Sequence, residues 1–197
     1  MPAPINLQHL NVKLVLKDPE ALNLELLIPV FHSWIEGQVC EDLLLDVADY
    51  RHVPGGPGVV LIGHQADYSV DNTDNRLGVR YNRKAALEGS NQDRLEQATR
   101  AALSACQRLE SDDRLDGTVR FGGQEMEIFV NDRLLAPNCD ATRKAAQQDC
   151  QDFAAKLFRG TECTLSYPTD DPRKLFSVSI KTLSSFLTAD LLQNLAM

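Results

Sequence analysis

The sequence lacks the cysteine patterns that cross-link secreted domains or bind zinc. Its five cysteines are odd in number, lie far apart and include no Cys-x-x-Cys pair. The first ten residues, MPAPINLQHL, also lack the basic segment and following apolar segment of a secretory signal peptide. Because disulfide frameworks belong to oxidising compartments, these absences predict reduced thiols and a cytoplasmic location.

The chain also lacks long apolar runs and an excess of positive charge. No apolar run approaches the ~20 residues that a membrane-spanning helix needs. Acidic residues number 28 and basic residues 20, which gives a formal net charge of −8. A surface of that sign repels anionic lipid and nucleic-acid phosphates. We therefore expect a soluble protein that binds no membrane. Nucleic acid is a disfavoured partner, although the stretch 76–84 carries four basic residues.

Motifs for cofactors and for known catalytic centres are absent as well. The link between 52 and 58, with Gly55 and Gly56 at its centre, has no Lys-Ser/Thr and is not a P-loop. The sequence contains no Gly-x-Gly-x-x-Gly, His-Glu-x-x-His or Gly-x-Ser-x-Gly pattern. It therefore identifies neither a cofactor nor a metal-ligand set, and the proline-glycine link is interpreted as a shaped turn between strands.

The residue patterns that are present predict an α+β fold. A chain of 197 residues with 43% apolar and 24% charged residues suits one compact domain, 1–197. An alternative is a two-part organisation, 1–112 and 117–197, because each part ends with a hairpin followed by a helix. Runs of neighbouring strands favour a mostly antiparallel sheet of about eight strands, as one sheet or two sub-sheets, with about four helices packed on it.

The individual elements follow from periodicity and from helix-capping residues. Residues 10–17 alternate as a half-buried strand, and Ser90 with Asp93 forms a capping box for the longest helix. The predicted strands cover 10–17, 43–50, 59–70, 76–84, 118–121, 124–131, 161–167 and 175–181. We expect 43–50, 59–70 and 76–84 to form an antiparallel meander and 118–121 to form a hairpin with 124–131. Because 59–70 is too long for one regular strand, Gly63 is interpreted as a bulge or a close backbone approach. The predicted helices cover 29–36, 90–110, a segment that starts near 140 and ends at 160, and 184–195.

The main candidate site consists of Asp46, His64 and Asp67. A hairpin through the proline-glycine link would set Asp46 opposite His64, and the next turn would bring Asp67 close to Tyr81. Imidazole and carboxylates could then bind a metal, or Asp46 could orient His64 as a general base. The structural interpretation, which we favour, is a cross-strand Asp–His pair whose polar groups satisfy each other beside the core.

Further residues are candidates for ligand binding. They are His52, Gly55, Gly56, Arg80, Tyr81, Asp132 and Arg133. Arg80 and Tyr81 lie on the strand next to the main candidate site. Asp132 with Arg133 could bind a carboxylate or phosphate, although turn and capping chemistry also explains this cluster.

Two functions remain open from the sequence. The first is a non-enzymatic protein that binds a partner protein or a small ligand, with a homo-oligomeric state expected. The alternative is a small hydrolytic or metal-assisted enzyme built around His64, Asp46 and Asp67. The sequence favours the first function because it contains a good core pattern and no coherent catalytic set.

Overall fold

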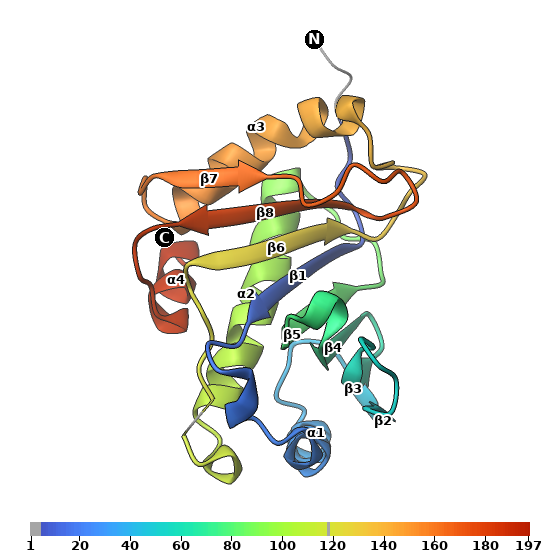
Figure 1. The fold of residues 1–197 in the computed structure, drawn as a ribbon, viewed down its shortest axis with the longest axis vertical. Helices are drawn as coiled ribbons and strands as arrows, with labels where there is room; N and C mark the ends of the chain where they lie inside the picture. Colours follow the sequence, from blue (N-terminus) through green and yellow to red (C-terminus); the bar gives the residue numbers. More distant parts are fainter. Residues whose placement is uncertain (1–4, 118) are drawn as a thin grey trace.

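The computed structural model describes residues 5–117 and 119–197, which form one antiparallel eight-stranded sheet with four helices packed on it (Figure 1). The predicted α+β class is confirmed, and the strands form one sheet, not two sub-sheets. The strands are β1 (Leu10–Val15), β2 (Leu44–Tyr50), β3 (Gly58–Gly63), β4 (Ala66–Asp71), β5 (Gly78–Arg83), β6 (Glu125–Val130), β7 (Cys163–Ser166) and β8 (Phe176–Thr182). The helices are α1 (Leu27–Gly37), α2 (Asn91–Glu110), α3 (Asp140–Leu157) and α4 (Thr188–Leu195).

The first strand of the chain lies in the middle of the sheet. The strand order is β2-β3-β4-β5-β1-β6-β8-β7, and β1 pairs antiparallel with β5 on one side and β6 on the other. Helix α1 packs on β2 and β3, α2 on β5 and β1, and α3 on β8 and β7, while α4 packs against α2 and α3. Strand β4 therefore lies under the boundary between α1 and α2.

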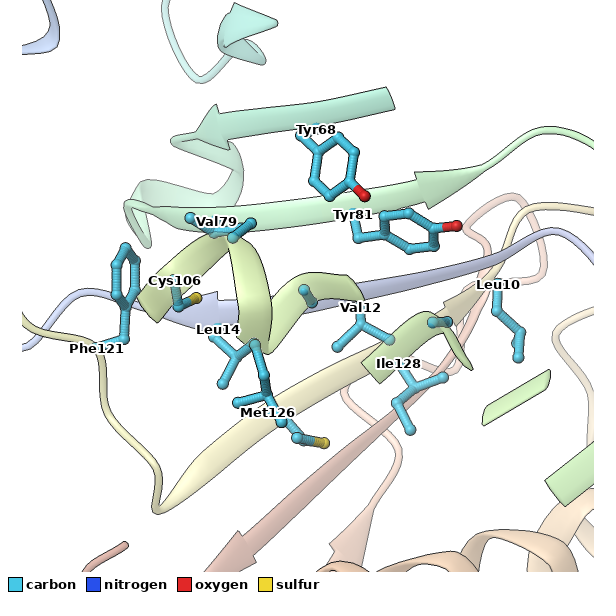
Figure 2. Close-up of a cluster of buried hydrophobic side chains, with 14 of the residues drawn as sticks. Leu10, Val12, Leu14, Tyr68, Val79, Tyr81, Cys106, Phe121, Met126 and Ile128 are labelled. Carbon is cyan, nitrogen blue, oxygen red and sulfur yellow. The ribbon is translucent and has the colours of Figure 1, made fainter. Parts of the chain in front are cut away.

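The core is centred on the face of β1 that points toward α2. Leu10, Val12 and Leu14 alternate along this face and are buried, as predicted, but the other face of β1 is buried as well, so the prediction of a half-buried strand is wrong (Figure 2). Full burial of a side chain of this size contributes roughly 1.5–3 kcal/mol to folding. Asn11 and Lys13 point to the face of the sheet that lies away from α2, here called the open face. Both side chains are nevertheless buried, with an exposed fraction of only 2%.

The strand predicted over 59–70 is in fact the hairpin of β3 and β4. Its turn forms because Asp42 accepts hydrogen bonds from the backbone nitrogens of Gln65 and Ala66, both at 2.7 Å. Gly63 is required at this turn, since a Cβ there would lie 2.4 Å from the Ala66 carbonyl oxygen. The predicted three-stranded meander is consequently a meander of four strands, β2 to β5.

Helix α1 begins earlier than the sequence predicted. It starts at Leu27, which places Pro29 in the first turn, where backbone N–H groups have no partner inside the helix. Proline therefore causes no break there. The helix includes Gly37, and the left-handed residue that ends it is Gln38, with φ of 43°.

The predictions for residues 90–197 are confirmed only in part. The Ser90–Asp93 capping box and the extent of α2 are confirmed. The strand predicted over 118–121 does not pair with β6: Thr118 lies outside the described residues, and Phe121 bridges to Leu16 instead. Strand β6 pairs with β1 and β8, so the predicted hairpin is wrong. Helix α4 starts at Thr188, four residues later than expected.

Candidate functional site

The strand register separates two of the three residues in the main predicted site. Asp46 lies opposite Ile62, not His64, and both Asp46 and His64 are exposed. The Asp46 carboxylate accepts a hydrogen bond from the backbone nitrogen of Val47 at 2.8 Å. Asp46 therefore has a local backbone partner on β2, which is an edge strand of the sheet.

Asp67 also has local partners. Its carboxylate accepts from Lys84 Nζ at 2.6 Å and from the backbone nitrogen of Gly63 at 3.3 Å. It lies opposite Asn82, one residue away from the predicted register with Tyr81. Across 5–117 and 119–197, no group of three histidine, cysteine or acidic side chains is arranged to hold a metal ion.

The predicted ligand-binding residues of the proline-glycine link shape a turn. Gly55 has φ of 62°, and the Gly56 carbonyl oxygen accepts from the backbone nitrogen of Asn72 at 3.2 Å. A Cβ at Gly56 would lie 2.8 Å from the Val53 side chain, so the turn requires glycine. His52 is exposed beside this turn.

The remaining predicted residues lie in three separate places. Arg80 is on the open face, 3.7 Å from Asp71 and over the ring of Phe129 at 4.7 Å. The Asp132 carboxylate accepts from the backbone nitrogens of the two residues that follow Arg133, at 2.9 and 3.0 Å, and Arg133 itself is exposed. Tyr81 points the other way, toward α2, where a pocket opens.

This pocket, with a volume of about 430 Å³, lies between α2, the α1–β2 link and the strands β4 and β5. We call it the inter-helix pocket. It exists because α1 and α2 cover the strands on either side of β4 and leave a gap between them. Its lining consists of Val39, Cys40, Glu41, Asp42, Gln65, Tyr68, Tyr81, Arg83, Leu87, Gln97, Arg100, Ala101, Ser104, Ala105 and Arg108.

Two tyrosines form the aromatic base of the inter-helix pocket. Tyr68 on β4 lies directly opposite Tyr81 on β5, so both side chains point to the same face of the sheet. Their ring centroids are 5.2 Å apart in an edge-to-face arrangement, and Figure 2 shows the rings on neighbouring strands. Gln97 Nε2 on α2 donates to the Tyr81 hydroxyl at 3.0 Å and fixes its orientation.

The ionisable groups beside this base are held in their protonated forms. Burial raises the pKa of the Tyr68 and Tyr81 phenols above the ordinary tyrosine value. Burial also raises the pKa of the Cys40 thiol, an effect that its hydrogen bond with Tyr68 partly offsets. Because the thiolate is the reactive form of cysteine, a raised pKa lowers the reactivity of Cys40.

Three arginines surround the inter-helix pocket. Arg108 donates to the Val39 carbonyl oxygen at 2.7 Å, and Arg100 donates to the Leu195 carbonyl oxygen at 3.1 Å. Arg83 donates to the Ala85 carbonyl oxygen at 3.0 Å and to the Gln65 side-chain oxygen at 2.9 Å. These acceptors are neutral, so they orient the guanidinium groups without neutralising their charge.

A second groove, of about 580 Å³, lies beside β7 and β8. It is larger and more open, and no aromatic ring lines it. Ligand sites combine apolar and aromatic surface with a few oriented polar groups. The inter-helix pocket has this composition, and it is therefore the candidate site.

Ten residues were predicted from the sequence as candidate site residues, and among them only Tyr81 lines the inter-helix pocket. A usable signal was present in α2, where Arg100, Ser104 and Arg108 recur every four residues beside the apolar stripe. Residues with this spacing share one helix face, so they predict a polar strip at the edge of the core. The position of Tyr68 depended on a register that the sequence left uncertain by one residue.

Comparisons with protein-family models, with curated proteins and with solved structures give no match to this chain. Within residues 5–117 and 119–197, no helix has both the length and the apolar character to cross a membrane.

Proposed function

We propose that this chain is a non-enzymatic binding protein that holds a small organic molecule in the inter-helix pocket. The observation that carries the proposal is the pocket itself, because its 430 Å³ falls within the ~300–1,000 Å³ range of small-molecule sites. Leu87 and Ala101 supply accessible apolar contact area. Gln97, Ser104 and the arginines supply hydrogen-bond donors.

Binding is favoured over catalysis by the residues that line the pocket. The described residues of its lining include no histidine, and the Asp42 carboxylate among them already accepts two backbone hydrogen bonds. The alternative, a hydrolytic or metal-assisted enzyme built on His64, Asp46 and Asp67, receives less support. Both of its carboxylates are already engaged, one with backbone and the other with Lys84.

Backbone amide NMR spectra during titration with small aromatic fragments test the proposal. Benzoate, benzamide and benzamidine share a shape and about nine heavy atoms, and fragments of this size bind with Kd values on the order of 1 mM. We expect at least one fragment to shift the amide signals of Tyr68, Tyr81 and Gln97. If none of the three causes such shifts, the proposed function is wrong.

Pocket-filling variants provide the matched control. Ser104→Trp places a large ring in the inter-helix pocket, whereas Gln107→Trp places the same ring on the exposed side of α2. We expect Ser104→Trp to abolish the fragment shifts and Gln107→Trp to preserve them. If Ser104→Trp fails to fold, Ala101→Phe fills the same space with a smaller ring. Unchanged binding in a folded, filled variant would refute this location.

A further inference from the structure

We propose that the ligand of the inter-helix pocket carries a negatively charged head group, a carboxylate or phosphate, attached to an apolar body. This inference rests on the proposed function, because it specifies the ligand of that same pocket. It is derived from the balance of charged side chains around the pocket.

The first observation is that the pocket arginines have no ionic partner. Within the described part of the chain, no carboxylate lies within 4.0 Å of the Arg83, Arg100 or Arg108 guanidinium groups. By contrast, Arg76 pairs with two glutamates on β6, at 2.7 and 2.9 Å. Like the pocket arginines, Arg120 elsewhere in the chain donates to neutral carbonyl oxygens, so the pocket is distinguished by having three such arginines around one cavity.

The two acidic residues of the pocket do not reverse this balance. The Asp42 carboxylate is engaged by the backbone nitrogens of Gln65 and Ala66, and Glu41 is exposed. Three guanidinium groups against two carboxylates leave one net positive charge at the pocket. An anionic group could therefore bind there with favourable electrostatics, whereas a cationic group would be repelled.

The helical spacing brings two of these arginines to one edge of the pocket. Arg100 and Arg108 are eight residues apart on α2, so their Cα atoms are separated by roughly 12 Å along one helix face. Ser104 lies between them and is small, which leaves room for a head group. Arginine presents several N–H donors in a fork that matches the oxygens of a carboxylate or phosphate.

The base of the pocket indicates the rest of the ligand. Leu87 and Ala101 supply accessible apolar surface, while the Tyr68 and Tyr81 rings beneath them are only 5% and 1% exposed. Accessible apolar surface favours a ligand with an apolar body, because binding removes apolar area from water. The pocket is thus suited to an acid with an apolar body whose head group faces α2.

Four probes of closely related shape test the charge of the head group. Benzoate is anionic, benzamide is neutral, benzamidine is cationic, and phenyl phosphate separates a phosphate head group from a carboxylate. We expect benzoate or phenyl phosphate to bind at least about tenfold more tightly than benzamide, and benzamidine to bind weakest. Added salt should weaken the binding of the anionic probes and leave benzamide unchanged.

Variants that remove an arginine charge test whether these arginines cause the tighter binding of anionic probes. We expect Arg100→Gln and Arg108→Gln each to weaken anion binding about threefold, and the double variant to weaken it about tenfold, with benzamide binding unchanged. Arg173→Gln removes the same charge from a side chain that is 88% exposed outside the pocket, and it should have no effect.

The outcomes separate this inference from the proposed function. If benzamide or benzamidine shifts the pocket amides as strongly as the anionic probes do, the pocket binds ligands but the charge inference is wrong. If anion binding persists unchanged in the Arg100→Gln/Arg108→Gln variant, the inference is also wrong. If no probe binds, the proposed function itself fails.

Discussion

The Lys13 network on the open face and the inter-helix pocket differ in how positive charge is compensated. On the open face, Lys13 donates to the buried Asp71 carboxylate, and Arg80 lies 3.7 Å from the same carboxylate. At the inter-helix pocket, Arg100 and Arg108 donate to neutral carbonyl oxygens. The Asp71 carboxylate thus compensates the positive charge on the open face, whereas no carboxylate among the described residues pairs with these two pocket arginines.

This difference separates structural charge from charge available to a ligand. A buried cation must be paired, because removing it from water without a partner is costly. An exposed cation can remain unpaired at little cost, since water solvates it. The open face therefore has its charges satisfied within the chain, whereas the inter-helix pocket retains positive charge that can act on another molecule.

The largest effect is expected from breaking the buried pair on the open face. Lys13→Met leaves the Asp71 carboxylate buried without its main partner, so the free energy of unfolding should fall by about 3–5 kcal/mol. The control, Lys181→Met, removes a lysine that is 55% exposed and pairs with Glu125. It should cost less than about 1 kcal/mol. Urea unfolding followed by circular dichroism measures the free energy of unfolding of both variants. Equal losses in the two variants would contradict the expected difference between a buried and an exposed charge.

A smaller effect is expected at the base of the inter-helix pocket. Tyr81→Phe removes the hydroxyl that accepts from Gln97 and leaves the ring packing intact. The net loss of stability should be about 0.5–1.5 kcal/mol, because an ordinary neutral hydrogen bond contributes that much. The same unfolding experiment measures it, with Tyr68→Phe as the comparison. If the free energy of unfolding fell as much as in Lys13→Met, the prediction that this neutral hydrogen bond contributes less than the buried ion pair would be wrong.

The smallest effect is expected at the sheet edge, where an exposed pair responds to pH. A hydrogen bond from the Arg51 side chain lowers the pKa of Asp49 to about 2, from an ordinary value of 3.8. A lowered pKa stabilises the folded state above pH 3.8, and this stability is lost as the pH falls through about 2. Asp49→Asn should therefore differ from the native protein at pH 5 and converge with it near pH 2. Urea midpoints across this range would contradict the prediction if the difference stayed constant.

Most of the fold could be predicted because its signals are local. Alternation along β1 and the capping residues of α2 each depend on a few neighbouring residues. The errors arose where distant residues decide the structure. Asp42 fixes the β3–β4 turn from about 24 positions away, and the sequence around Gly63 gives no sign of this partner.

The candidate site was harder to predict, because it depends on register and on which strand remains uncovered. A shift of one residue brought Tyr68 opposite Tyr81, and a shift of two separated Asp46 from His64. Side chains that face each other in a predicted hairpin can therefore lie apart in the structure. The residues around the pocket also come from four separate segments, which no local pattern links. Periodicity within α2 was the only local sign of the polar strip.

The position of β1 has a consequence for the order in which the chain can assemble. Its partners, β5 and β6, lie roughly 70 and 115 residues further along the chain. Pairing over such separations slows folding, because a long loop must close before any contact is gained. During synthesis, the meander can form as soon as its own residues emerge, whereas β1 keeps an unpaired edge until β6 has been made. The strand made first is thus among the last to be enclosed.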